Sequence, residues 1–149
     1  MLSVKKLIYF ALLSGVFVWC QAAAQTSAPV PVTSENLGWV TSPRNSGAQI
    51  ARVLGAEKEP GLYVIRMKLA PGTKTNPHTH PDERLFEVLA GTLYFGFGET
   101  FDETKLVKIP TGAVFAVPAK MPHFAWAKDG ETVYQESGIG PSSTDYLKQ

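Results

Sequence analysis

From residue 37 onward, the chain alternates short apolar segments with turns that are rich in glycine, proline and aspartate. Along residues 62–69 every second side chain is apolar, and Arg66 and Lys68 lie between them, as in a half-buried strand. Short strands at even spacing are typical of an all-β sandwich or barrel. The Asp129-Gly130 pair predicts a two-residue hairpin turn. The segments predicted as strands are residues 49–55, 62–69, 84–90, 92–98, 105–109, 113–117, 123–128 and 132–137.

Residues 1–24 have the arrangement of a secretory signal peptide, with a basic start, an apolar stretch and small residues at Ala22 and Ala24. The apolar stretch is shorter than the roughly 20 residues that a membrane-spanning helix needs, which disfavours the alternative of a retained anchor. We therefore expect cleavage after Ala24 and a periplasmic or secreted protein. Residues 25–36, rich in proline, serine and threonine, are predicted to form a flexible arm. The predicted barrel domain then covers residues 37–141, and residues 142–149 form a C-terminal tail.

Removal of the signal peptide changes the chemistry that the chain offers. Cys20, its one cysteine, would be lost, so the mature protein would contain no disulfide. Cleavage also removes Lys5 and Lys6 from the 14 basic residues, which leaves 12 against 13 acidic residues. Without a net positive charge or a basic run, nucleic acid is excluded as a partner, and so is a membrane once the signal is cleaved.

All three histidines of the chain lie where one metal site would need them. His78 and His80 form a His-x-His pair, which on an extended strand directs both rings to the same face. His123 follows more than forty residues later and fits a ligand from a second strand. Neutral imidazole is the commonest protein ligand for metals, so this set predicts a metal site. The structural alternative is three hydrogen-bonded histidines without a metal.

The glycines and histidines also resemble the two sequence motifs of the cupins. The first motif corresponds to Gly72, five residues, His78-Thr79-His80 and Gly91, and the second to Gly112, five residues, Pro118 and His123. The resemblance covers about residues 72–127, and the sequence also resembles a subgroup of small exported bacterial cupins. It implies a double-stranded β-helix (jelly-roll) barrel with one divalent metal ion held by His78, His80 and His123, and a homodimer. Zinc, iron, copper and nickel all suit three imidazoles, and the sequence does not rank them.

The chain departs from the cupin pattern at Arg84. Cupins usually place a glutamate ligand seven residues before the closing glycine, and a guanidinium has no lone pair with which to replace it. Either the site is a three-histidine centre, or Glu83 reaches back as a fourth ligand. Strand parity favours three histidines, because an inward Arg84 places Phe86 and Val88 inward and Glu87 outward.

An inward Arg84 beside a metal dication requires an anion between the two charges. One interpretation is that Arg84, with Gln135 on the last strand, binds a small anionic organic ligand that also coordinates the metal. The other interpretation is structural, with Arg84 in a salt bridge to Asp82, Glu83 or Glu87.

Three functions are compatible with these residues. The first is an exported module that binds a metal, and a small molecule through it, without turnover. The second is a metal-dependent oxygenase that acts on a small organic acid or diketone, because three imidazoles leave coordination positions open. The third is a structural protein without metal. We favour the metal-binding module, with the oxygenase as the alternative.

Overall fold

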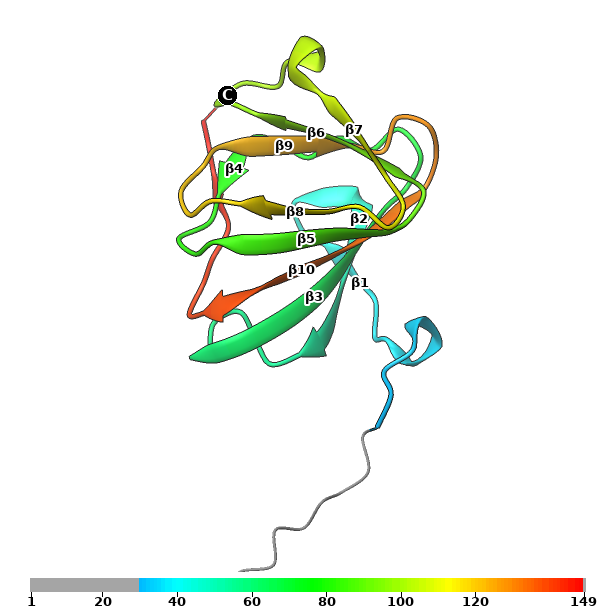
Figure 1. Cartoon of the computed structure of the whole chain (residues 1–149), viewed down its shortest axis with the longest axis vertical. Coiled ribbons are helices and arrows are strands. Elements are labelled where there is room, and N and C mark those ends of the chain that lie inside the picture. Colours follow the sequence, from blue (N-terminus) through cyan, green and yellow to red (C-terminus); the bar gives the residue numbers. More distant parts are fainter. Residues whose placement is uncertain (1–29, 149) are drawn as a thin grey trace, which may run out of the picture. The chain divides into compact units, whose positions relative to one another are not determined.

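The computed structural model describes residues 30–148, in which residues 31–148 belong to one compact unit of two antiparallel β-sheets (Figure 1). The predicted signal peptide, residues 1–24, lies outside the described residues, as do residues 25–29 of the predicted arm. In the described part of the arm, residues 34–36 form a 3₁₀ turn, η1 (Ser34–Asn36). Within residues 30–148, no helix has the length and apolarity needed to cross a membrane.

The two sheets have six and five strands. The larger sheet has the strand order β1-β2-β3-β10-β5-β8, and its strands are β1 (Val40–Ser42), β2 (Asn45–Leu54), β3 (Gly61–Leu69), β10 (Thr132–Gly140), β5 (Arg84–Ala90) and β8 (Val114–Val117). The smaller sheet has the order β11-β4-β9-β6-β7, with β11 (Asp145–Tyr146), β4 (His78–Thr79), β9 (His123–Trp126), β6 (Thr92–Phe97) and β7 (Val107–Pro110). A second 3₁₀ turn, η2 (Glu103–Lys105), precedes β7. The predicted jelly-roll architecture is confirmed.

Each of the eight predicted strands is present, and three more strands were not predicted: β1, β4 and β11. The predicted hairpin at Asp129-Gly130 was wrong, because β9 belongs to the smaller sheet and β10 to the larger one. This segment therefore crosses between sheets. Residues 142–149, predicted as a tail, contain β11, which pairs with β4.

The core lies between the sheets and is built by alternation along each strand. On β5, Arg84, Phe86 and Val88 are buried while Leu85 is exposed, as parity predicts. Phe86 stacks on Phe115 and on Tyr134, with ring centroids 5.2 and 5.8 Å apart. Burying a phenylalanine of this kind contributes about 1.5–3 kcal/mol. The aromatic layer gives the inward-facing side chains next to it a rigid support.

The turn at Gly91 sets the register between β5 and β6, and so between the two sheets. Its φ of +75° lies in the left-handed region, and a Cβ at this position would meet the backbone carbonyl of Glu131. Only glycine adopts this conformation without strain and without that clash. The glycine that closes the first cupin-like motif is therefore required by the backbone.

Candidate metal centre

Two adjacent strands of the smaller sheet bring the three histidines together. His78 on β4 and His123 on β9 are direct partners in the antiparallel ladder. His80 lies two residues beyond His78, just after β4 ends, so its ring is directed to the same side. A His-x-His pair beside a third histidine on the neighbouring strand is thus a direct product of the strand register.

The three rings form one compact cluster. Their centroids are 5.0 Å apart for His78 and His80, 4.3 Å for His78 and His123, and 5.1 Å for His80 and His123. One nitrogen from each ring lies within 4.8 Å of the other two. His80 and His123 are 4 % and 1 % exposed. His123 also stacks on Phe95, with centroids 5.3 Å apart, so the hydrophobic core fixes its ring plane.

Each histidine is oriented by a backbone carbonyl. The Nδ1 atoms of His78, His80 and His123 lie 2.7, 2.8 and 2.9 Å from the carbonyl oxygens of Asn76, Ser143 and Met121, respectively. Because a carbonyl oxygen only accepts, each Nδ1 carries the proton and donates, and each Nε2 keeps a lone pair. The structure thus fixes the tautomer in which Nε2 can bind a metal.

Two of the three Nε2 lone pairs have no partner within residues 30–148. The Nε2 atoms of His80 and His123 are buried without a hydrogen bond among the described residues. An unsatisfied buried polar group costs about 1–3 kcal/mol, and a folded protein rarely retains two side by side. A metal ion between the rings would satisfy both, and three neutral imidazoles are a suitable donor set for zinc, iron, copper or nickel. The residues therefore fit a metal.

Burial keeps these imidazoles neutral. Desolvation, followed by the charge of Arg84, lowers the pKa of His80 to about 3. Desolvation and then the neighbouring His78 lower the pKa of His123 to about 3. The pKa of His78 is lowered as well, by desolvation, against the raising effect of its bond to Asn76. The deprotonated form that binds metal is therefore the resting form at neutral pH.

The other residues predicted for the site are placed differently. Glu83 is exposed and does not belong to the histidine cluster. Gln135 accepts a hydrogen bond from Arg66 Nε at 3.2 Å and does not line the cavity, whereas its neighbours Tyr134 and Glu136 do. The sequence interpretation therefore assigned the wrong residue of β10 to the pocket, because adjacent residues on a strand face opposite sides.

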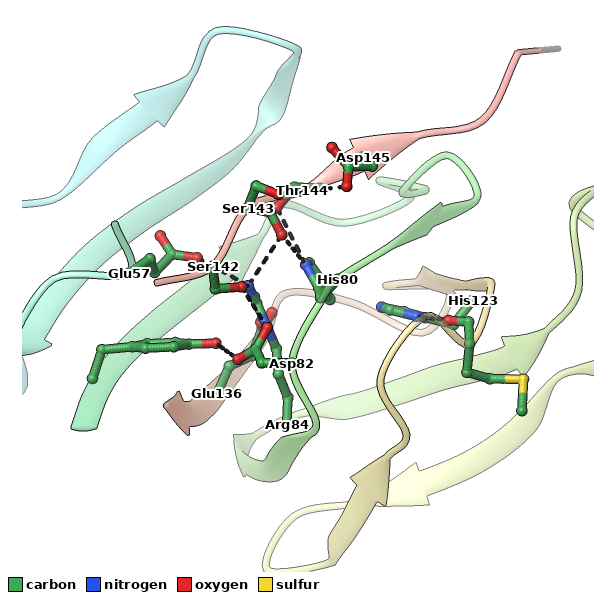
Figure 2. Close-up of polar contacts among 12 residues, drawn as sticks. Glu57, His80, Asp82, Arg84, His123, Glu136, Ser142, Ser143, Thr144 and Asp145 are labelled. Carbon is green, nitrogen blue, oxygen red and sulfur yellow. Dashed lines mark hydrogen bonds and ion pairs between the residues drawn. The ribbon is translucent and has the colours of Figure 1, made fainter. Parts of the chain in front are cut away.

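Arg84 lies on the inward face beside the histidines, but the protein itself supplies the anions that it requires. Its guanidinium is 1 % exposed and contacts Glu136 at 2.6 Å, Glu57 at 3.3 Å and Asp82 at 3.4 Å. Figure 2 shows these carboxylates gathered around it. Of the carboxylates that the sequence interpretation considered, the structure pairs Arg84 with Asp82, and not with Glu83 or Glu87.

The carboxylates of this network differ in environment. Desolvation is the largest influence on Asp82 and would raise its pKa, but hydrogen bonds from Ser142 and Tyr63, with the charge of Arg84, hold that pKa below its ordinary value. The pKa of Glu57 is raised, chiefly by desolvation. The attraction of Arg84 does not reverse this effect, because repulsion from Glu136 and Asp82 opposes it. One cation is therefore shared by three carboxylates, and Glu57 is the least favourably placed of them.

A cavity of about 270 Å³ adjoins the cluster. His78 and His80 line it together with Arg84 and Glu136, and apolar side chains such as Met67 and Tyr134 form other parts of its wall. Small-molecule sites commonly combine an apolar lining with a few convergent polar groups. The open side of the histidine cluster is thus accessible to a small molecule.

Comparison with known proteins identifies the family. The cupin domain family matches residues 65–135, a range that includes all three histidines. The chain belongs to the cupin superfamily. Germin-like protein 5-1 of Oryza sativa subsp. japonica is 39 % identical over 67 residues, which are 43 % of this chain and 29 % of that protein. The chain thus spans less than a third of the length of this relative.

Solved structures share the cupin fold at low sequence identity. The polyketide cyclase RemF from Streptomyces resistomycificus superposes with a TM-score of 0.68 at 13 % identity, over 82 % of this chain and 87 % of that one. A mutant of salicylate 1,2-dioxygenase from Pseudoaminobacter salicylatoxidans, in complex with gentisate, has a TM-score of 0.58 at 19 % identity, over 70 % of this chain and 30 % of that one. Likeness at this level establishes the fold.

Sequence reasoning missed the residues that surround the histidines. Glu57, Glu136, Ser142 and Ser143 all contact Arg84, and Ser143 also contacts His80. One signal was available: an inward arginine in a barrel with three histidines requires carboxylate partners, and Glu136 lies on a predicted strand. Ser142 and Ser143 gave no such signal, because they follow the last predicted strand.

Proposed function

We propose that this protein is an exported metal-binding cupin in which His78, His80 and His123 hold one divalent metal ion through their Nε2 atoms. The observation that carries the proposal is the pair of buried Nε2 atoms, on His80 and His123, without a hydrogen-bond partner among the described residues. The carbonyl contacts at all three Nδ1 atoms support it, since they fix the ligating tautomer.

The chain's residues divide the work at this site. The three imidazoles bind the ion, and the aromatic layer of Phe86 and Phe95 keeps water from the inner side of His123. The cavity lies on the side lined by His78 and His80, so a small molecule can approach the open coordination positions from there. A bound divalent ion would supply Lewis acidity and a coordination site for an oxygen or nitrogen atom of that molecule.

A small anionic ligand remains part of this proposal, with a different residue as its cation. Arg84 is occupied by three carboxylates, whereas Arg44 lines the same cavity, is exposed and has no ion-pair partner among residues 30–148. Its guanidinium lies 5.1 Å from the ring centroid of Tyr146. We expect Arg44→Gln to weaken binding of benzoate to the metal-loaded protein several-fold and to leave binding of neutral benzamide unchanged. Equal effects on both probes would remove the anion from the proposal.

Metal analysis tests the main proposal. The mature protein, purified without chelators, should contain about one equivalent of a divalent metal, and His123→Ala should lose most of it. Trp126→Phe is the matched control, since Trp126 is on the same strand, its indole donates to the carbonyl of Gly72, and it should retain the metal. Absence of metal from the unmutated protein, or full retention by His123→Ala, would contradict the site.

A metal-dependent oxygenase acting on a small organic acid or diketone is the second candidate. The observation that favours it is the cavity, which brings His78 and His80 together with an apolar wall suited to a small organic molecule. Oxygen uptake by the iron-loaded protein with small organic acids and diketones, dependent on His123, would support it. Oxygen uptake no higher than that of His123→Ala would exclude the oxygenase and leave metal binding as the proposed function.

Export and homodimerisation are further parts of the proposal. The sequence of residues 1–24 supports export, and a mature N-terminus at Gln25 in a periplasmic or secreted fraction would establish it. Exposed apolar side chains on the outer face of the larger sheet support a dimer, namely Leu62, Leu85, Val114 and Ile139. Light scattering should then give twice the mass of the mature chain, and the mass of a single chain would exclude a stable dimer.

A further inference from the structure

The segment that follows β10 closes one side of the metal centre. We call residues 142–147 the C-terminal strap. It leaves the larger sheet after β10 and joins the smaller sheet as β11, so it crosses from one sheet to the other (Figure 1). Backbone hydrogen bonds fix both of its ends, from the N–H of Ser142 to the carbonyl of Glu57 at 2.5 Å and from the N–H of Leu147 to the carbonyl of Pro77 at 3.0 Å.

The strap contacts two of the three candidate ligands. The carbonyl oxygen of Ser143 accepts the hydrogen bond from His80 Nδ1 at 2.8 Å. Tyr146 pairs with His78 in the β11–β4 ladder, and their ring centroids are 5.4 Å apart. The tautomer and ring orientation of His80 therefore depend on the position of the strap backbone at Ser143.

Arg84 holds the strap at that point. Its Nη2 atom donates to Ser142 Oγ at 2.9 Å and to the carbonyl oxygen of Ser143 at 3.5 Å. The carbonyl that orients His80 is thus also contacted by Arg84, as Figure 2 shows. Ser142 Oγ in turn donates to Asp82, which ties the strap to the carboxylates around the guanidinium.

We infer that Arg84 is a positioning residue of the metal centre: it fixes the C-terminal strap, and the strap orients His80 for the metal. The inference rests on the proposed metal site. Arg84 occupies the strand position beside the histidines, contacts none of the ligating nitrogens, and supports one ligand through Ser142 and Ser143. Partners that orient a metal-binding histidine commonly contribute 10- to 100-fold to metal affinity.

Two consequences follow from this arrangement. A strap that is released from Arg84 lets His80 rotate, so the metal binds more weakly. Coupled equilibria are reciprocal. If docking of the strap raises the metal affinity by some factor, metal binding raises the equilibrium constant for strap docking by the same factor. Zinc binding should therefore slow hydrogen exchange at the amide of Leu147, which is bonded to Pro77.

The experiment compares zinc affinity with hydrogen exchange in three variants. Ser142→Ala removes the strap hydroxyl, and Arg84→Lys keeps the charge but loses the planar fork that reaches Ser142, Ser143 and Glu136 together. Arg66→Lys is the matched control, since Arg66 is on the same sheet and bonds Gln135 and Ser34 instead. Zinc is titrated into chelator-treated protein against a competing chelator, and amide exchange is followed with and without zinc.

We expect zinc to bind about 10-fold more weakly to Ser142→Ala and Arg84→Lys, and normally to Arg66→Lys. Strap amides should exchange faster in the first two variants, while core amides on β5 are unchanged in Ser142→Ala. A merely structural role would speed exchange throughout the barrel and leave the zinc affinity of the folded protein intact. If both variants bind zinc within twofold of the unmutated protein although their strap amides exchange faster, the positioning role of Arg84 is overturned and the metal site is not. Failure of the unmutated protein to bind zinc, iron, copper or nickel would overturn the metal site itself.

Discussion

Glutamine in place of Glu136 should destabilise the protein much more than glutamine in place of Glu57, although both carboxylates contact Arg84. Glu136 lies 2.6 Å from the guanidinium with its side chain 6 % exposed, whereas Glu57 lies 3.3 Å away and is 24 % exposed. Removing one partner from a buried ion pair costs about 3–5 kcal/mol when nothing replaces it. Asp82 and Glu57 remain beside Arg84 in Glu136→Gln, so we expect a loss of about 2–3 kcal/mol, as for a hydrogen bond to a charged group.

Glu57→Gln should change stability by less than about 0.5 kcal/mol. A partly exposed pair contributes only about 0–1 kcal/mol, and the exchange also relieves repulsion from Glu136 and Asp82. The pKa of Glu57 is raised, chiefly by desolvation, which means that folding disfavours its ionised form. This agrees with a small loss of stability when the carboxylate is removed. The assay is urea unfolding of chelator-treated protein at pH 7, with the slope on urea required to stay constant. Equal losses for the two variants, or a larger loss at Glu57, would refute this view of the network.

Two other measurements test the histidine cluster and the packing beside Arg84. In metal-free protein, the pKa values of about 3 for His80 and His123 lie below the ordinary 6.5, so the unfolded chain binds more protons between these pH values. The free energy of unfolding should therefore fall as the pH falls from 6.5 towards 3, by up to about 1.4 kcal/mol per pH unit for each histidine. Urea unfolding at several pH values measures this dependence. A His80→Gln/His123→Gln variant whose unfolding free energy changes with pH as steeply as that of the unmutated protein would contradict it. Gly138→Ala places a methyl group against the Asp82 carboxylate and the Tyr63 hydroxyl and should cost about 1–3 kcal/mol in the same assay. Gly38→Ala, where the added carbon meets open space, should stay within about 0.5 kcal/mol, and equal effects would exclude the proposed crowding.

The fold could be predicted because its strands carry a local signal. Alternation along residues 62–69 and glycine at Gly91 are properties of short segments, and both appear in the structure where expected. Strands of two or three residues, such as β4 and β11, are too short to show a period. The turn at Asp129-Gly130 was misassigned because a turn sequence does not determine which sheet the next strand joins.

The site was predictable to the extent that its residues lie in register on strands. The shared face of the His-x-His pair follows from parity, as does the shared face of Arg84, Phe86 and Val88, and the structure shows both. An inward Arg84 indicates carboxylate partners, but their identity does not follow, because Glu57 and Glu136 lie 27 and 52 residues away in the sequence. Gln135 was assigned to the pocket wrongly because neighbouring residues on a strand face opposite sides of the sheet. An error of one residue on β10 therefore replaces a pocket side chain with one on the outer face.

X-ray absorption spectroscopy of the zinc-loaded mature protein tests the three-histidine centre most directly, because it counts the ligands on the ion. We expect three imidazole nitrogens at about 2.0–2.1 Å, and two after His123→Ala. A first shell with fewer than three imidazoles in the unmutated protein, or one unchanged by His123→Ala, would contradict a metal centre built from His78, His80 and His123.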